Sequence, residues 1–223
     1  LINGGGEIAS NVDVFFEALG LEILVGYGLT ETSPVVSCRM PWKNVRGSSG
    51  PPLPETEFRI VDPETRQAKV FGERGLVLVK GPQVMKGYWE NEEATNEAID
   101  EEGFFKTGDI GTLNSDGFIK IVDRKKDMIL VSGFNVYPNE IEDVVCMHPG
   151  IIEAASIGVS DEKTGEAVKL FVVLGEDQKL KKEEIIDYCR KNLTAYKVPR
   201  QIEFMKELPK TTVGKILRRE LRE

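Results

Sequence analysis

The sequence predicts a two-part protein, with α/β structure and a small β-rich subdomain in residues 1–122 and a compact α+β domain in residues 123–223. Gly-rich turns, a helix-like stretch and a short apolar strand follow one another in the first 30 residues, an order typical of parallel α/β structure. Short strands between Gly and Pro turns then predict the β-rich subdomain over residues 47–122. Beyond it, apolar strands alternate with amphipathic helices, as in one further domain.

The elements are expected in a definite order. In the first part we expect a helix over 11–19, strands over 22–26, 57–61, 75–80 and 117–122, and a helix near 92–100. In the second part we expect strands over 128–131, 154–159, 167–174 and 201–205, and helices over 138–147, 182–191 and 215–221. Pro138 suits the first turn of its helix, where the missing N–H donor costs nothing.

A run of five charged residues, 123–127, separates two apolar strands. Five consecutive charges cannot belong to a core, so we expect the whole run to be exposed. Either a charged hairpin turn or an inter-domain hinge explains it, and the hinge interpretation places the domain boundary here.

Composition and charge restrict the function. Residues 1–122 carry 11 Lys and Arg against 19 Asp and Glu, whereas the second part is neutral. Because non-specific nucleic-acid binding needs a basic face, we expect no nucleic-acid partner. The three cysteines share no metal-ligand spacing and are typical of reduced cytosolic thiols. The segment 206–223 is locally basic, which indicates either a solvated helix face or a means of bringing a cation to a phosphate.

Three short motifs have the chemistry of a nucleotide site, and each also has a plain structural explanation. Gly4-Gly5-Gly6-Glu7 allows close approach of a flat ligand or forms a turn. Tyr27-Gly28-Leu29-Thr30-Glu31-Thr32 combines a stacking face, hydroxyls for phosphate and a carboxylate for Mg²⁺, or is a turn in which Thr30 caps the backbone and Glu31 faces water. Thr107-Gly108-Asp109 offers a carboxylate to ribose hydroxyls, or is a tight turn.

These motifs occur in order with two further segments, Lys120-Ile-Val-Asp-Arg-Lys-Lys-Asp-Met-Ile-Leu-Val-Ser-Gly-Phe-Asn-Val-Tyr-Pro138 and Pro209-Lys-Thr-Thr-Val-Gly-Lys-Ile-Leu-Arg-Arg219. Together they resemble the adenylate-forming superfamily of acyl-CoA synthetases, peptide-synthetase adenylation domains and luciferases. The run 121–145, with Glu166-Ala-Val-Lys169, Tyr196-Lys-Val-Pro199 and Leu208-Pro-Lys210, is most similar to bacterial long-chain fatty acyl-CoA synthetases.

The resemblance implies an AMP-forming acid–thiol ligase. A fatty acid would be activated by ATP to an acyl-adenylate, and the thiol of CoA would then displace AMP. Residues 1–122 would be the end of the large adenylating domain, and 123–223 a mobile lid. An aryl-, medium-chain or amino-acid-activating ligase of the same fold, or a non-catalytic nucleotide-binding module, is the alternative.

The resemblance also implies roles for individual residues. The adenosine moiety of ATP or AMP would be bound by Gly4, Gly5, Gly6, Glu7, Tyr27, Gly28, Asp109, Ile121 and Arg124. Within this group, Asp109 would bind the ribose hydroxyls with Arg124 beside it, and Ile121 would touch the base.

The remaining implied roles concern catalysis and movement. Thr30 would contact phosphate and Glu31 would hold Mg²⁺, while Lys215 would reach the acid carboxylate and the α-phosphate during adenylation. Lys126 would be the hinge. The loop of Ser132, Gly133 and Phe134 would close on the pantetheine tunnel of CoA.

Some family features do not appear in this sequence. The Ser/Thr/Gly-rich phosphate loop and most of the acyl pocket are missing, so we expect a C-terminal fragment that is inactive without an N-terminal part of the same chain. Lys106 also stands where the fatty-acid branch usually has His. A cytoplasmic location is expected, with peripheral membrane contact of the whole enzyme left open because long-chain acids partition into bilayers. The oligomeric state is not indicated.

Overall fold

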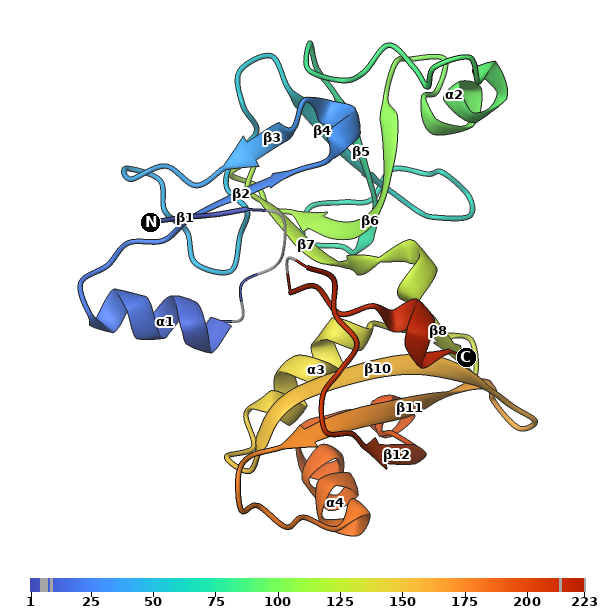
Figure 1. The fold of residues 1–223 in the computed structure, drawn as a ribbon. Coiled ribbons are helices and arrows are strands. Elements are labelled where there is room, and N and C mark those ends of the chain that lie inside the picture. Colours follow the sequence, from blue (N-terminus) through green and yellow to red (C-terminus); the bar gives the residue numbers. More distant parts are fainter. Residues whose placement is uncertain (5–7, 9, 213, 223) are drawn as a thin grey trace. The chain divides into compact units, whose positions relative to one another are not determined.

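A computed structural model describes residues 1–4, 8, 10–212 and 214–222. The chain divides into two compact units, Leu1–Lys125 and Lys126–Glu223 (Figure 1). Mixed α/β structure, the fold class expected from the sequence, is confirmed.

The first unit begins with a three-stranded sheet and one helix. Strand β1 (Ile2–Asn3) runs parallel to β2 (Leu24–Gly28), and α1 (Ser10–Ala18) connects them. Strand β3 (Val35–Cys38) pairs antiparallel with β2. Arg39, at the end of β3, forms a buried ion pair of 2.7 Å with Asp13 of α1, so a charged contact fixes the helix to the sheet.

A four-stranded antiparallel sheet makes up the rest of the first unit. It contains β4 (Glu57–Val61), β5 (Gly75–Lys80), β6 (Phe105–Leu113) and β7 (Ile119–Arg124) in that order, with α2 (Glu92–Ala98) before β6. Because β5 is buried on both faces, it is a continuous apolar run. Val77 and Val79 face one core, and Leu76 and Leu78 face another that includes Phe104.

The two sheets of the first unit are joined through a glycine. Ser49 donates its N–H to Ile119 O at 2.7 Å, and Ile119 donates its own N–H to Gly50 O at 3.1 Å. Gly50 has φ +88°, and a Cβ atom at this position would overlap the backbone of Cys38. Only glycine allows β3 and β7 to come this close.

The second unit is a five-stranded sheet covered on both faces. Its strands are β8 (Ile129–Val131), β9 (Phe134–Val136), β10 (Ile151–Asp161), β11 (Gly165–Leu174) and β12 (Gln201–Phe204). Their order is β10-β11-β8-β9, with β12 parallel to β11.

Alternation along β11 produces two cores in the second unit. Val168, Leu170 and Val172 share one core with residues of α3 (Pro138–Cys146) and α4 (Lys182–Asn192). Phe171 and Val173 share the other with residues of the C-terminal segment, such as Leu208 and Leu221. The C-terminal segment, and not a layer of helices, therefore covers the second face of this sheet. None of the helices among the described residues has the length and apolar character needed to cross a membrane.

Two expectations about local structure are wrong. The helix expected over 215–221 is only a 3₁₀ turn, η4 (Arg218–Leu221), because Ile216 instead forms a β-bridge with Lys210 and Gly214 has φ +82°. The charged run 123–127 is not wholly exposed, since Asp123 and Asp127 are buried. Asp127 has a compensating partner, Arg222, at 2.9 Å, which is what a buried carboxylate requires.

Candidate functional site

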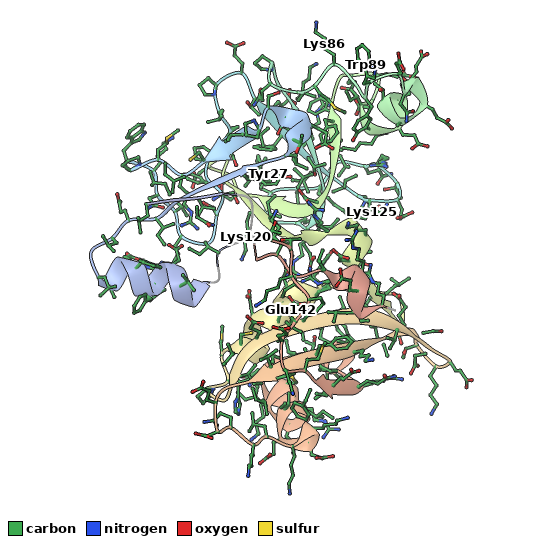
Figure 2. All side chains as sticks on the ribbon, viewed as in Figure 1. Tyr27, Lys86, Trp89, Lys120, Lys125 and Glu142 are labelled. Atoms are coloured by element: carbon green, nitrogen blue, oxygen red, sulfur yellow. The ribbon has the colours of Figure 1, made fainter. Side chains whose placement is uncertain are left out.

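A buried carboxylate is the centre of the candidate site in the first unit. Asp109 on β6 is 5% exposed, and its Oδ2 accepts a hydrogen bond of 2.7 Å from the phenol of Tyr27 on β2. Arg124, the register partner of Asp109 on β7, places Nε 3.5 Å from Oδ1. Figure 2 marks Tyr27 beside the strands of this unit. The structure thus brings together three of the residues that the sequence assigned to the adenosine moiety.

The motif Thr107-Gly108-Asp109 is a bulge inside β6 and not the tight turn considered from the sequence as its structural explanation. On β5 only Val77 lies between the paired residues Leu76 and Leu78, whereas on β6 the three residues of the motif lie between their partners. Thr107 Oγ1 donates to Val77 O at 2.8 Å and accepts the N–H of Asp109 at 3.1 Å. A bulge re-aims a side chain within it, which here is the Asp109 carboxylate.

The electrostatics of this group act mainly on the tyrosine. Burial of the phenol, followed by the negative charge of Asp109, raises the pKa of Tyr27 well above its ordinary value of 10.0. A hydrogen bond with Thr107 and the charge of Arg124 act in the opposite direction. The raised pKa keeps the phenol protonated, so it remains a donor to Asp109.

In the turn after β2, Thr32 caps the backbone, so the side chains of Thr30 and Glu31 are not used for capping. In η1 (Thr30–Thr32) the buried Thr32 closes the turn, accepting the N–H of Leu29 at 3.0 Å and donating to Pro34 O at 2.7 Å. Thr30 is exposed and is not the cap considered from the sequence. A Cβ atom on Gly28 would overlap the Pro34 carbonyl, so the chain itself requires this glycine.

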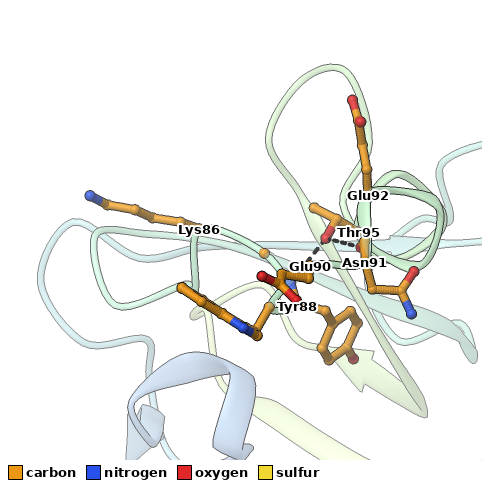
Figure 3. A pocket seen from close by; sticks show the side chains of 8 residues that line it. Lys86, Tyr88, Glu90, Asn91, Glu92 and Thr95 are labelled. Atoms are coloured by element: carbon orange, nitrogen blue, oxygen red, sulfur yellow. Dashed lines mark hydrogen bonds between the residues drawn. The ribbon is translucent and has the colours of Figure 1, made fainter.

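Glu31 lies beside a hollow that the sequence did not indicate. Its Oε1 accepts a hydrogen bond of 3.1 Å from the Tyr88 hydroxyl, and Tyr88 N–H donates to Thr95 Oγ1 at 2.9 Å. Figure 3 shows this hollow, lined by Lys86, Gly87, Tyr88, Trp89, Glu90, Asn91, Glu92 and Thr95. The available signal was the aromatic pair Tyr88-Trp89 in an otherwise polar stretch.

Glu31 is suited to a metal ion that also takes ligands from outside the protein, such as substrate phosphates and waters. Among the described residues there is no group of three or more His, Cys, Asp and Glu side chains that could hold a metal ion. One carboxylate fits Mg²⁺, because this ion keeps several waters and is commonly bound by one or two carboxylates together with substrate phosphates.

The other residues expected to contact adenosine are less constrained. Ile121 is half-buried against the core shared by the two sheets of the first unit. Gly4 has open space around it. Gly5, Gly6 and Glu7 lie outside the described residues.

The loop of Ser132, Gly133 and Phe134 is the tip of the β8–β9 hairpin in the second unit. Ser132 and Gly133 have φ +50° and +83°, the left-handed pair of a two-residue hairpin turn. The Phe134 ring is 55% exposed and stacks on Tyr196, with centroids 4.7 Å apart and planes 17° apart. Ser132 N–H donates to Thr164 O at 2.8 Å, so the hairpin tip is held on two sides.

Lys215 is presented on a narrow loop of the second unit. Thr211 donates its N–H to Lys215 O at 2.8 Å, and Lys215 donates its own to Thr211 Oγ1 at 3.1 Å. The Lys215 side chain is exposed. It can therefore move without breaking a core contact.

The candidate residues therefore form separate groups. Tyr27, Asp109 and Arg124 belong to the first unit, whereas Lys126, the Ser132–Phe134 tip and Lys215 belong to the second. The sequence also missed the ion pairs behind Lys215. Arg218, which the basic tail suggested was a solvated residue, is largely buried and contacts Glu142 at 2.7 Å.

Two segments of the chain match known family models. Residues 1–89 match the AMP-binding enzyme family, and residues 140–215 match the AMP-binding enzyme C-terminal domain. Lys215 is the last residue of the second match. Asp109, Arg124 and the Ser132–Phe134 tip lie between the two matched segments.

The chain is also similar to curated ligases and to a solved structure. It is 53% identical to the long-chain-fatty-acid–CoA ligase of Salmonella typhimurium, over 99% of this chain and 39% of that protein. It is 42% identical to the mitochondrial medium-chain acyl-CoA ligase ACSF2 of Danio rerio, over 91% of this chain and 34% of that protein. ATP-bound MatB from Rhodopseudomonas palustris superposes with a TM-score of 0.94 at 35% identity, over 99% of this chain and 44% of that one. The chain thus spans well under half the length of these relatives.

The Tyr27–Asp109 contact predicts an unusual alkaline titration. In wild-type protein, phenolate absorbance should show Tyr27 ionising well above pH 10.0, beside Tyr88, whose pKa is also raised by burial and by Glu31, and Tyr27→Phe should remove the Tyr27 step. Asp109→Asn should lower the pKa of this phenol without restoring its ordinary value, because burial remains. Since the unfolded chain loses the proton first, the contribution of Tyr27 to stability is present below pH 10 and falls as the pH rises above it. If Tyr27→Phe lost no late step, with Tyr88→Phe as the control that identifies the Tyr88 step, the assignment would be contradicted.

Proposed function

Because this chain belongs to the AMP-binding enzyme family, we propose that it is the C-terminal part of an ATP-dependent long-chain fatty acid–CoA ligase. The observation that carries the proposal is a similarity to long-chain ligases that extends over 99% of the chain and through both units. The acid carboxylate attacks the α-phosphorus of ATP and pyrophosphate leaves. The CoA thiol then attacks the acyl carbon of the adenylate, AMP leaves, and the thiol proton is released.

The first unit would hold the adenosine part of ATP. Asp109 has a fixed direction because Tyr27 donates to one of its oxygens and Arg124 lies near the other. A carboxylate oxygen has lone pairs for more than one donor, so the ribose hydroxyls can be added to these contacts. Ile121 and the glycines of Gly4–Glu7 would border the base.

Thr30 and Glu31 would serve the phosphates. Thr30 is exposed next to β2, and its hydroxyl is not used to cap the turn. Glu31 would share Mg²⁺ with ATP, and the ion would offset the negative charge of the phosphates.

Lys215 and the Ser132–Phe134 tip would act in different half-reactions. Negative charge on the phosphate oxygens is stabilised by a nearby cation in a dry site, so Lys215 would lower the barrier to adenylation. The hairpin tip, with its exposed Phe134, would border the pantetheine arm of CoA. Two half-reactions with different nucleophiles need different surroundings for one adenylate, which domain movement can supply.

The contacts on either side of Lys126 support its assignment as the hinge. Lys125 donates to Pro63 O at 3.3 Å and pairs with Glu64 at 3.1 Å, both in the first unit. Asp127 pairs with Arg222 of the second unit at 2.9 Å. Lys126 itself is exposed, so rotation of its backbone would disturb neither set of contacts.

A medium-chain acid is the second candidate substrate, because the Danio rerio relative is named for medium-chain acids. The full-length enzyme would also make peripheral contact with membranes, since its substrate partitions into bilayers.

The proposed function is tested on the full-length protein that carries this chain. With ATP, Mg²⁺ and CoA, we expect palmitate to release pyrophosphate and yield palmitoyl-CoA more efficiently than octanoate or benzoate does. The isolated chain should yield none under the same conditions, because the chain spans only 39% of the Salmonella ligase. Preference for octanoate would favour the medium-chain alternative. Acyl-CoA formation by the isolated chain would contradict the proposal that it is only the C-terminal part of the enzyme.

Lys215→Ala in the full-length enzyme should separate the half-reactions. Adenylation should fall by about 100-fold or more, the usual cost of removing one group that stabilises charge in the transition state. Conversion of supplied palmitoyl-adenylate to palmitoyl-CoA should continue at close to the wild-type rate. Stopped assays of the two steps make the comparison, and equal losses in both would show that Lys215 has another role.

Lys126→Pro tests the hinge. Proline fixes φ near −65° and also restricts the preceding residue, so it limits rotation at this point. We expect adenylation to survive and thioester formation to slow, with Lys126→Ala, which removes only the charge, near wild type in both. Single-turnover measurements of each step decide the matter, and normal rates in the proline variant would place the pivot elsewhere.

A further inference from the structure

The base of the Lys215 loop contains a network of ion pairs with no role assigned above. We propose that Arg218 is a positioning residue, which holds the loop so that Lys215 is correctly placed for adenylation. The inference rests on the proposed function, and in particular on the role of Lys215.

The loop does not determine its own position. The bonds between Thr211 and Lys215 are internal to it, and the Lys210–Ile216 bridge and the 2.8 Å bond from Leu217 N–H to Pro209 O close its base. These contacts fix the shape of the loop. They do not fix its direction relative to the sheet.

Two charged contacts supply that direction: Lys210, at the base of the loop, pairs with Glu153 on β10, and Arg218 bonds to α3. Arg218 Nη2 donates to Glu142 Oε2 and to Asn139 Oδ1, each at 2.7 Å, and both acceptors are on α3. The other oxygen of Glu142, Oε1, accepts the backbone N–H of Ser156 on β10, also at 2.7 Å. Directional bonds therefore lead from the central sheet through α3, where Figure 2 labels Glu142, to a residue three positions after Lys215.

The same segment is attached to the residue that follows the proposed hinge. Arg222 pairs with Asp127 at 2.9 Å, and Arg218 Nη1 lies 4.0 Å from the same carboxylate. The Lys215 loop is thus tied to the start of the second unit as well as to α3. Any movement about Lys126 carries the loop along with the whole unit.

The burial of these charges indicates that they fix the position of the Lys215 loop more than they stabilise the fold. The side chains of Arg218 and Glu142 are 16% and 11% exposed. A buried ion pair adds little net stability, because desolvation offsets most of the attraction. Leu208 and Leu221 already bury the segment, but apolar contacts have no direction. Hydrogen bonds from the Arg218 guanidinium are directional, because this planar group fixes the angle at which the acceptors approach.

The test uses two Arg218 variants of the full-length enzyme. Arg218→Lys keeps the charge but replaces the planar guanidinium, whose Nη2 bonds to both acceptors, by an ammonium without a fixed plane. Arg218→Met combined with Glu142→Gln removes both charges, so no uncompensated carboxylate is left, and the glutamine oxygen can still accept the Ser156 N–H. In both we expect adenylation to slow by about 10- to 100-fold, the scale of a small misplacement of a reacting group. Thioester formation from palmitoyl-adenylate should change less than about threefold.

Two controls make the result specific. Arg190→Met removes an exposed ion pair with Asp187 on α4 and should leave both steps unchanged. In a Lys215→Ala background, the Arg218 substitutions should cause no further loss of adenylation, because residues that act through one another are not additive.

Equal losses in both half-reactions, or the same loss with and without Lys215, would overturn the positioning role. So would wild-type adenylation in both Arg218 variants. If the wild-type enzyme itself released no pyrophosphate with palmitate, the proposed function would fail first, and the two failures are therefore distinguishable.

Discussion

A carboxylate that is 5% exposed has to be surrounded by donors, and in the first unit this requirement determines how its two sheets meet at Asp109. The partners of Asp109 come from different places: Tyr27, on the three-stranded sheet, donates a hydrogen bond, and Arg124, at the end of the four-stranded one, forms an ion pair. The bulge at Thr107–Asp109 turns the carboxylate towards them, and the glycine at position 50 lets the sheets approach. The group proposed to bind ribose is therefore also a structural joint. Its orientation is set before any ligand arrives, which reduces the ordering that binding would require.

The sequence predicts best those strands and helices that have mainly local contacts or are buried on both faces. The strands over 57–61 and 75–80 have the bounds expected, because a short apolar run between Gly and Pro turns has few other stable conformations. The helix beginning at Pro138 was recognisable for a similar reason. The presence of Asp109, Tyr27 and Arg124 could be read from motifs. Their convergence could not, because it depends on strand register and on a bulge formed by residues that look like a turn.

One kind of wrong expectation has a clear physical cause, which is that a charged side chain was treated as a solvated one. Asp127 is buried and Arg218 is largely buried, because each is compensated by a residue distant in sequence, Arg222 and Glu142 respectively. Periodicity along one segment contains no information about such partners. The helix expected at 215–221 failed for a different reason: Ile216 forms a bridge with Lys210, Gly214 has φ +82°, and Leu221 packs against the sheet face without a full helix.

The two groups of candidate residues are each held rigidly, but by different means. Asp109 is fixed by strand pairing, a hydrogen bond and an ion pair, whereas Lys215 depends on a loop whose direction is set by Lys210 and Arg218 at its base. Neither group can adjust much without breaking directional bonds in its own unit. A reaction that uses both must therefore take its freedom of movement from the connection between the units, where Lys125 is bonded to one side and Asp127 to the other. Rigid attachment of Lys215 is therefore a condition for the proposed movement of the second unit between the two half-reactions. A lid that moves as one body places its cation accurately only if the cation does not move within the lid.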